Sequence, residues 1–316
     1  MTKPGRTISF AGCLFILICS NLSLSQQINL STLLNEIVDR EQIASFPEPL
    51  YQCKQASSYN RESVSPDSPG WFADSDGIGF VRVEENNGKK EWVLMEDEGP
   101  GCIAKIWAVC FYYGLNNTTG ANIHIYLDGA DEPTISENFF RFVKGQAFVK
   151  PPFADSSTRA GNLYFPIPYA RGCKITMDSR AFYNIINYRS YAPGTDVRTF
   201  TMAEFKAVAP LREKVAQVLN TRPDARGKTI QKAQTLSQGQ HLSCVLPAGA
   251  GAVKQLEIKL EASDAMAQAL RSVVLKGQFD RDQTLWVPVG DFFNNVSKIR
   301  PYDMWERSVE ADGTLV

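Results

Sequence analysis

The sequence around which the fold is organised reads G-W-F-A-D-S-D-G-I-G-F-V-R-V-E at residues 70–84 and E-W-V-L-M-E-D-E-G-P-G at residues 91–101. Residues 78–84 and 91–95 are rich in aromatic and β-branched side chains, which are enriched in strands. The segment G-K-K at residues 88–90 separates them, and a short turn that contains glycine commonly joins antiparallel strands. The sequence therefore predicts a β-hairpin here.

The loop that precedes this hairpin is unusually rich in aromatic, amide and charged side chains: Tyr59, Asn60, Arg61, Trp71, Phe72, Asp74 and Asp76. Aromatic rings can stack on the apolar faces of sugars, and amide or charged groups hydrogen-bond their hydroxyls. A sugar-binding loop would have this composition. A well-packed surface loop with Trp71 as its core anchor is the other interpretation, and both stand at this point.

The overall composition is that of a globular protein. Of the 316 residues, 44% are hydrophobic and 21% are charged, which is enough apolar material for one large or two ordinary domains. Lysine and arginine number 33 against 34 aspartates and glutamates. Such a balance provides no electrostatic attraction toward nucleic acid, and we predict no nucleic-acid partner.

The N-terminus has the pattern of a secretory signal peptide. Lys3 and Arg6 precede an apolar run at residues 8–19, and the small-residue pattern S-L-S follows at residues 23–25. The apolar run is too short to span a bilayer. We therefore predict a signal peptide over residues 1–25 with cleavage near Ser25, a secreted or periplasmic location, and no membrane span.

The cysteines indicate neither a disulfide framework nor a zinc site. Five remain after the predicted signal, an odd number without C-x-x-C spacing: Cys53, Cys102, Cys110, Cys173 and Cys244. A single bridge between Cys102 and Cys110 is conceivable in an oxidising compartment. We predict no metal site.

The chain after the signal begins with an amphipathic helix at residues 30–38, with Ser31 as a candidate cap. Prolines then lead into extended chain, so residues 26–60 are predicted to form an N-terminal arm. Further strands are expected at residues 103–113, 121–127, 163–168, 173–177 and 183–191. Many short strands separated by turns predict an all-β jelly-roll sandwich over residues 61–202, with a few short helices.

A helix is expected at residues 203–219, within a connecting segment that ends at residue 227. Strand patterns resume at residues 241–246, 253–260 and 270–279, and residues 285–293 follow them. These are too few strands for a second sandwich of the same size. Residues 228–316 are therefore predicted to be an incomplete second jelly roll.

Few side chains are candidates for catalysis. The only histidines are His124, which alternates with isoleucines on a predicted strand, and His241. The run Glu96, Asp97 and Glu98 ends a strand; such a run is usually a solvated turn, whereas a glycosidase needs two carboxylates across one bond. Asp291, before two phenylalanines, either orients a sugar hydroxyl or caps a turn.

The sequence resembles the domain-of-unknown-function proteins now grouped as glycoside hydrolase family 172, which includes difructose-dianhydride I synthase/hydrolase and exo-acting arabinofuranosidases. The resemblance runs from about Arg40 to the C-terminus and rests on ten short motifs in order. They are S-S-Y-N-R, G-W-F-A-D, K-E-W-V-L-M, G-P-G with I-W shortly after, I-Y-L-D-G, P-P-F, N-L-Y-F-P-I-P-Y, C-K-I-T, I-N-Y-R and V-P-V-G-D-F-F.

The resemblance implies two tandem jelly rolls, homotrimers or dimers of trimers, and a glycan as the binding partner. It also implies anomer-retaining cleavage of terminal furanosides without a cofactor, by two glutamates roughly 5 Å apart. In the family these glutamates lie in a Gly-Glu-Gly-Asp-Glu stretch and a Thr-Glu-Asp stretch, and neither occurs here. We therefore assign no catalytic residue and expect this chain, as a truncated member, to be inactive alone.

The residues that match the family positionally are assigned to sugar binding: Tyr59, Asn60, Arg61, Trp71, Asp76, Asp291 and Phe292. Two alternatives remain open. One is a carbohydrate-binding protein without catalysis, and the other is a purely structural jelly roll, because fold alone does not determine function.

Overall fold

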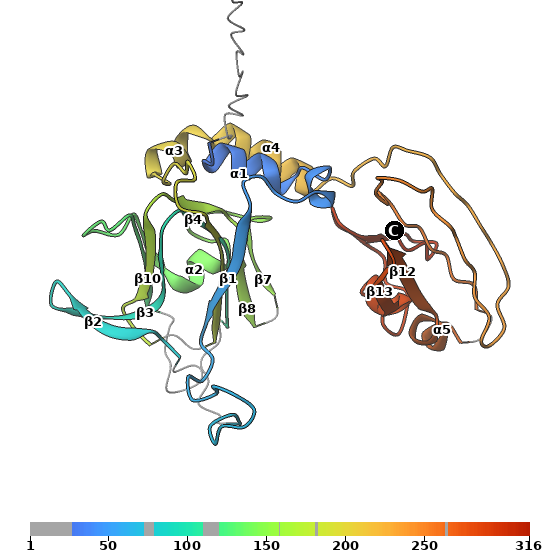
Figure 1. The fold of residues 1–316 in the computed structure, drawn as a ribbon, viewed down its shortest axis with the longest axis horizontal. Coiled ribbons are helices and arrows are strands. Elements are labelled where there is room, and N and C mark those ends of the chain that lie inside the picture. The colour runs from blue at the N-terminus through green and yellow to red at the C-terminus, as the bar shows by residue number, and fades with distance from the viewer. Residues whose placement is uncertain (1–26, 73–78, 110–119, 158, 181–182, 263–264) are drawn as a thin grey trace, which may run out of the picture.

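The computed structural model describes residues 27–72, 79–109, 120–157, 159–180, 183–262 and 265–316. Within these residues the chain forms a large antiparallel β-sandwich and a smaller C-terminal unit (Figure 1). The predicted all-β sandwich is therefore confirmed. No helix in this described part is long and apolar enough to cross a membrane. The predicted signal peptide, residues 1–25, lies outside the described residues.

The sandwich consists of two antiparallel sheets. Its strands are β1 (Tyr51–Ser57), β2 (Arg82–Asn86), β3 (Lys89–Glu98), β4 (Gly101–Val109), β5 (Asn122–Leu127), β6 (Ile135–Asn138), β7 (Ala154–Ser157), β8 (Ala160–Leu163), β9 (Ile167–Tyr169), β10 (Gly172–Met177) and β11 (Asn184–Tyr191). One sheet has the order β1-β11-β4-β8-β7, with β9 also paired to β4, and the other has the order β2-β3-β10-β5-β6.

The predicted hairpin is present as β2 and β3, which pair from Arg82 opposite Val93 to Asn86 opposite Lys89. The turn differs by one position from the prediction, because Lys89 already belongs to β3. Its central residues are Asn87 and Gly88, with φ angles of 51° and 76°. A two-residue turn that matches strand twist needs positive φ at both positions, and Asn-Gly adopts this conformation most easily.

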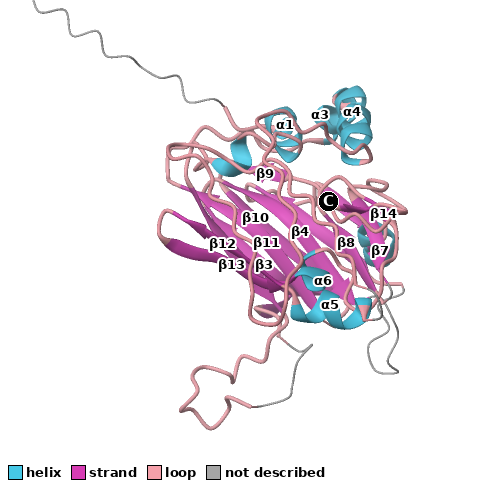
Figure 2. Cartoon of the chain, turned by 90° about the vertical axis from the view of Figure 1, so that its right-hand side faces the viewer, coloured by secondary structure: helices cyan, strands magenta, loops and turns pink. Residues whose placement is uncertain are grey.

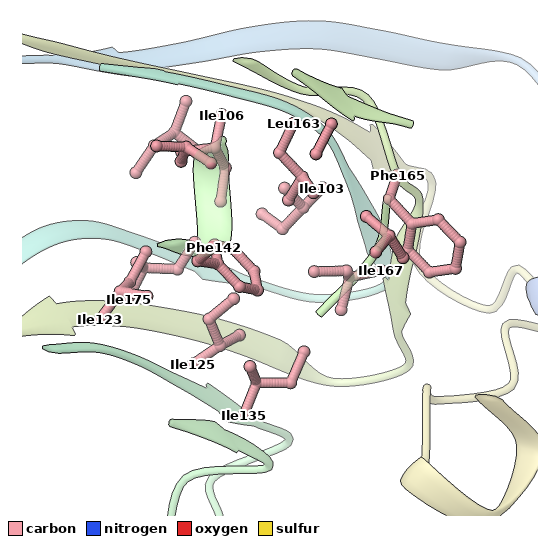
Figure 3. Close-up of a cluster of buried hydrophobic side chains, with 14 of the residues drawn as sticks. Ile103, Ile106, Ile123, Ile125, Ile135, Phe142, Leu163, Phe165, Ile167 and Ile175 are labelled. Carbon is pink, nitrogen blue, oxygen red and sulfur yellow. The ribbon is translucent and has the colours of Figure 1, made fainter. Parts of the chain in front are cut away.

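The core lies between the two sheets, and isoleucine and phenylalanine are its most frequent residues (Figure 3). Helix α2 (Phe139–Val143), which the sequence analysis missed, places Phe142 fully buried in this core. Burial of one such side chain stabilises the fold by about 1.5–3 kcal/mol. Ten of the core residues are labelled in Figure 3: Ile103, Ile106, Ile123, Ile125, Ile135, Phe142, Leu163, Phe165, Ile167 and Ile175.

The N-terminal segment belongs to this core and is not the separate arm that was predicted. Helix α1 (Leu30–Ile37) buries Leu30 and Leu34 in the main hydrophobic cluster, and β1 pairs with β11 over its whole length. The cap of α1 is Asn29 and not Ser31, because the Asn29 side chain accepts a hydrogen bond from the backbone of Thr32 at 3.0 Å. A one-turn helix, η1 (Gln42–Ala44), follows. Strand β1 was not predicted, because its many polar residues obscure the alternation of apolar and polar side chains.

The predicted connecting helix is divided into α3 (Met202–Ala207) and α4 (Ala209–Leu219). The break coincides with Pro210, which lies in the first turn of α4. Proline cannot donate a backbone hydrogen bond, so it fits the start of a helix and disrupts its interior. Figure 2 shows α1, α3 and α4 together beyond one end of the sandwich, whereas the loop before β2 extends from the opposite end.

The C-terminal unit contains α5 (Met266–Ser272), β12 (Val274–Phe279), β13 (Asp282–Pro288), α6 (Val289–Phe292), β14 (Tyr302–Asp303) and β15 (Ser308–Val309). Its small core is formed by Leu270, Val289, Phe293, Val309 and Leu315. The strands predicted at residues 241–246 and 253–260 are absent, apart from a single bridge between Ile258 and Leu315. The proposed division into two jelly rolls stays a prediction.

Candidate functional site

The loop between β1 and β2 is fixed to the sandwich at both ends. At its start, the Ser58 hydroxyl accepts a hydrogen bond from the backbone of Asn184 at 3.0 Å, and the Ser58 amide donates to the Asn184 carbonyl at 3.1 Å. Near its end, a β-carbon on Gly79 would lie 2.1 Å from the carbonyl oxygen of Tyr59. Only glycine allows this close approach, so the loop returns tightly onto its own beginning.

Tyr59 and Arg61 form a stacked pair on the loop. The guanidinium carbon of Arg61 lies 3.9 Å from the centre of the Tyr59 ring, and an Arg61 nitrogen donates to the Gly79 carbonyl at 3.5 Å. The Tyr59 side chain is half exposed. A guanidinium held in this way keeps donors in its own plane that can reach a hydroxylated ligand.

Asn60 supports the loop from within. It is 5% exposed, and its side-chain oxygen accepts a hydrogen bond from the backbone of Glu62 at 3.0 Å. Its side-chain nitrogen has no hydrogen-bond partner among the described residues. A buried donor of this kind usually meets a water molecule or a ligand, because leaving it unpaired costs free energy.

Trp71 and Phe72 are presented to solvent. The backbone of Trp71 is held by Ser68 and Ser63, yet its side chain is 38% exposed and that of Phe72 is 90% exposed. The interpretation of Trp71 as a core anchor is therefore wrong. Phe72 was not among the predicted binding residues, although its place beside Trp71 in a polar loop was the signal for it. The predicted Asp76 lies outside the described residues.

Asp291 and Phe292 lie in the C-terminal unit, and the structure does not bring them to the loop (Figure 1). Asp291 forms an ion pair with Arg271 at 2.6 Å. The Phe292 ring packs edge-on against Phe293, and its carbonyl accepts a hydrogen bond from Arg307 at 3.0 Å. These contacts hold helix α6 in its own small core.

The acidic run at residues 96–98 lies on strand β3 and not in a turn. Glu96 therefore faces outward, where it pairs with Arg82 at 2.6 Å. Asp97 faces inward and is buried, and it accepts hydrogen bonds from Tyr169 at 3.0 Å and Lys54 at 3.3 Å. The strand alternation thus assigns neighbouring acids to different environments.

Glu84 and Glu96 are both held in the ionised form on this sheet. The hydrogen bond from Arg82 lowers the pKa of Glu96. Burial alone would raise the pKa of Glu84, but hydrogen bonds from Lys174 and Arg82 lower it. A glycosidase acid needs the opposite shift, because it must hold a proton near neutral pH. Neither residue is therefore suited to protonate a leaving group.

His124 and Cys102, which the sequence analysis considered, lie on strands β5 and β4 and not in the loop. His124 on β5 shares a 2.9 Å hydrogen bond with Ser136 at the surface. The Cys102 thiol is buried and donates to the Ile103 carbonyl at 3.2 Å. Cys110, its possible partner, lies outside the described residues.

Comparison with known protein families shows to which family the chain belongs. Residues 49–208, about half of the chain, match the family described as the GH172 first beta-sandwich domain. The chain belongs to glycoside hydrolase family 172. The matched range begins just before β1 and ends between α3 and α4, so it covers the whole sandwich and the candidate loop of this family 172 protein. No curated protein matches the chain.

Proposed function

We propose that this family 172 chain recognises a terminal furanoside through the loop between β1 and β2. The observation that carries the proposal is that Tyr59, Trp71 and Phe72 are exposed on the same loop as Arg61, whose guanidinium stacks on Tyr59. Ring faces bind the apolar side of a sugar, and a guanidinium binds hydroxyls. Membership of a glycoside hydrolase family supports a glycan as the ligand.

The complete protein is proposed to be an anomer-retaining exo-furanosidase that acts on fructofuranosides or arabinofuranosides. We further propose that it is secreted or periplasmic and assembles as homotrimers or dimers of trimers. The acid/base and nucleophile are assigned to glutamates outside this sequence, which has neither of the glutamate motifs that the resemblance implies. The ionised state of Glu84 and Glu96 supports this assignment.

Isothermal titration calorimetry of the chain with the methyl furanosides of arabinose and fructose tests the recognition. We expect Trp71→Ala and Phe72→Ala each to weaken binding by about fivefold, because stacking on an aromatic ring contributes on the order of 1 kcal/mol. Trp286→Ala is the matched control, since Trp286 is 65% exposed on β13 in the other unit. Equal affinities for the Trp71, Phe72 and Trp286 variants would refute the role of the loop.

A carbohydrate-binding protein without catalysis is the second candidate. The ion pairs of Glu84 and Glu96 with Arg82 and Lys174 favour it. Incubation of the chain with nitrophenyl furanosides separates the possibilities that concern catalysis. We expect no release of nitrophenol by this chain. Turnover that Glu96→Gln abolishes would place catalysis on the sandwich itself and overturn the assignment of the glutamates to residues outside this sequence.

A further inference from the structure

A groove of about 200 Å³ lies at the end of the sandwich opposite the loop, where α1 and η1 meet β1 and β11. Figure 1 shows this end, with α1 above the start of β1. Its lining combines aromatic, amide and charged side chains, among them Asn35, Glu36, Gln42, Tyr51, Arg189 and Tyr191. The volume suits one small ring and not an extended ligand, since pockets for drug-sized molecules are roughly 300–1,000 Å³.

Arg189 and Glu36 form one wall of the groove. Two parallel contacts of 2.7 Å and 2.8 Å join the guanidinium to the carboxylate. Burial alone would lower the pKa of Arg189, but the hydrogen bonds to Glu36 raise it, so the guanidinium stays charged. Paired charges of this kind are rigid and present fixed donors and acceptors.

Two tyrosines form the adjoining wall. The Arg189 guanidinium lies 4.4 Å from the centre of the Tyr51 ring, and the Tyr51 and Tyr191 rings meet edge-on at 5.8 Å. Burial raises the pKa of Tyr191 to about 12, so its hydroxyl keeps its proton and can donate a hydrogen bond. The groove therefore has an apolar surface next to a polar one.

The rim is fixed by Asp39, whose side-chain oxygen accepts hydrogen bonds from the backbone of Glu41 at 3.1 Å and Gln42 at 3.2 Å. Glu48 lies on the same rim. These acids do not approach one another as metal ligands, because the described residues contain no cluster of three or more histidine, cysteine or acidic side chains. The groove instead mixes donors and acceptors around aromatic rings.

We propose that this groove is a second carbohydrate site that holds a single sugar ring of a glycan, separate from the loop between β1 and β2. Sugar hydroxyls both donate and accept hydrogen bonds, which suits a wall of guanidinium, carboxylate and amide groups. The apolar face of the ring packs against the tyrosines. The choice of a furanose as the ring rests on the proposed function.

Saturation-transfer difference NMR with methyl arabinofuranoside and methyl fructofuranoside tests the groove in the full chain. The triple variant Tyr59→Ala/Trp71→Ala/Phe72→Ala removes the exposed aromatic side chains of the loop, and we expect the saturation transfer that remains to come from the groove. Adding Arg189→Met to this background should weaken the remaining binding by at least about tenfold, because the guanidinium is the main fixed donor.

Arg189→Met leaves Glu36 without its partner and can reduce stability. The rim variant Gln42→Ala/Glu48→Ala avoids this problem, since both side chains are exposed. In the same loop-variant background we expect it to weaken binding by about threefold with an unchanged melting temperature, as for loss of one modest hydrogen bond. Trp286→Ala in that background should leave binding unchanged.

Two results would overturn the second site. One is loss of all sugar signal in the loop triple variant, and the other is residual signal that both groove variants leave intact. Spermidine serves as the competing class of ligand: if it binds the groove and methyl furanosides do not, the groove is a cation site. If the loop variants bind sugar as tightly as the wild type and the groove variants bind it more weakly, only the proposed function of the loop is contradicted. Failure of the second site and failure of the proposed function are therefore distinguishable.

Discussion

The β-sandwich and the residues that follow α4 contain similar alternating sequences but differ in what those sequences form. In the sandwich, residues 173–177 form β10, which is paired on both sides by β3 and β5. In the later segment, residues 241–246 also have apolar side chains at every second position, 242, 244 and 246, yet residues 224–255 are exposed and contain no strand. An alternating sequence alone therefore does not produce a strand, and residues 173–177 form one because neighbouring strands pair with them.

Limited proteolysis gives the largest expected contrast between these two regions. We expect trypsin to cleave after Arg226, Lys228 or Lys232 at least about tenfold faster than within the sandwich, because local opening there costs almost no free energy. Mass spectrometry of the first fragments locates the cuts. First cleavage inside β2 or β3 would show that residues 224–255 are protected and that the contrast is wrong.

A core substitution measures the same contrast as a stability difference. Phe165→Ala should reduce the free energy of unfolding of the sandwich by about 3–5 kcal/mol, because it leaves a cavity in a closely packed core. Val245→Ala, at a side chain that is 86% exposed, should change it by less than about 0.5 kcal/mol. Urea denaturation followed by circular dichroism provides both values. Similar losses for the two variants would mean that residue 245 is packed.

The N-terminal helix sharpens the boundary of the sandwich. Asn29→Ala should reduce the free energy of unfolding by about 1 kcal/mol, since it removes the cap of a helix that is part of the core. Ser31→Ala, at the position that the sequence suggested as the cap, is the control and should have a smaller effect. If the Asn29 variant is as stable as the wild type, α1 does not contribute to the stability of the sandwich, as expected of a separate arm.

The smallest expected effect concerns acid stability. The pKa of Glu84 is lowered in the folded state, so its contribution to stability is present above the ordinary pKa of about 4.5 and is lost as the pH falls below it. Glu84→Gln should therefore flatten the decline in melting temperature between pH 5 and pH 3. Asp312→Asn removes an exposed partner of Lys259 in the C-terminal unit and should alter this profile less. A larger change in the pH profile for Asp312→Asn than for Glu84→Gln would contradict this prediction.

The elements that the sequence predicts well are those whose signals are local. The hairpin depends on two apolar strands and a turn with positive φ, and β5, β10 and β11 stand out because their apolar residues alternate. The predictions at residues 26–60 and 241–246 were both wrong because strand formation depends on a neighbouring strand. One segment contains a strand that was not predicted, and the other lacks a strand that was. Polar β1 becomes a strand because β11 pairs with it, whereas residues 241–246 have no neighbouring strand in the described structure.

The candidate loop could be named from the sequence because its aromatic residues are close together in the chain. The exposure of these residues could not be predicted, since composition alone is also consistent with a Trp71 that is packed in the core. The groove was not predicted at all, because the contact between Glu36 and Arg189 joins residues 153 positions apart. Such a pair becomes visible only after α1 has packed beside β11.

Strand β1 sets a fixed distance within the molecule. It begins with Tyr51 in the groove and ends with Ser57 immediately before the loop, and it pairs with β11 in continuous register. Seven residues at about 3.3 Å each separate its two ends by roughly 20 Å. A glycan that occupied both places at once would need at least this length, so affinity should increase abruptly, rather than gradually, once an oligosaccharide is long enough to span the strand.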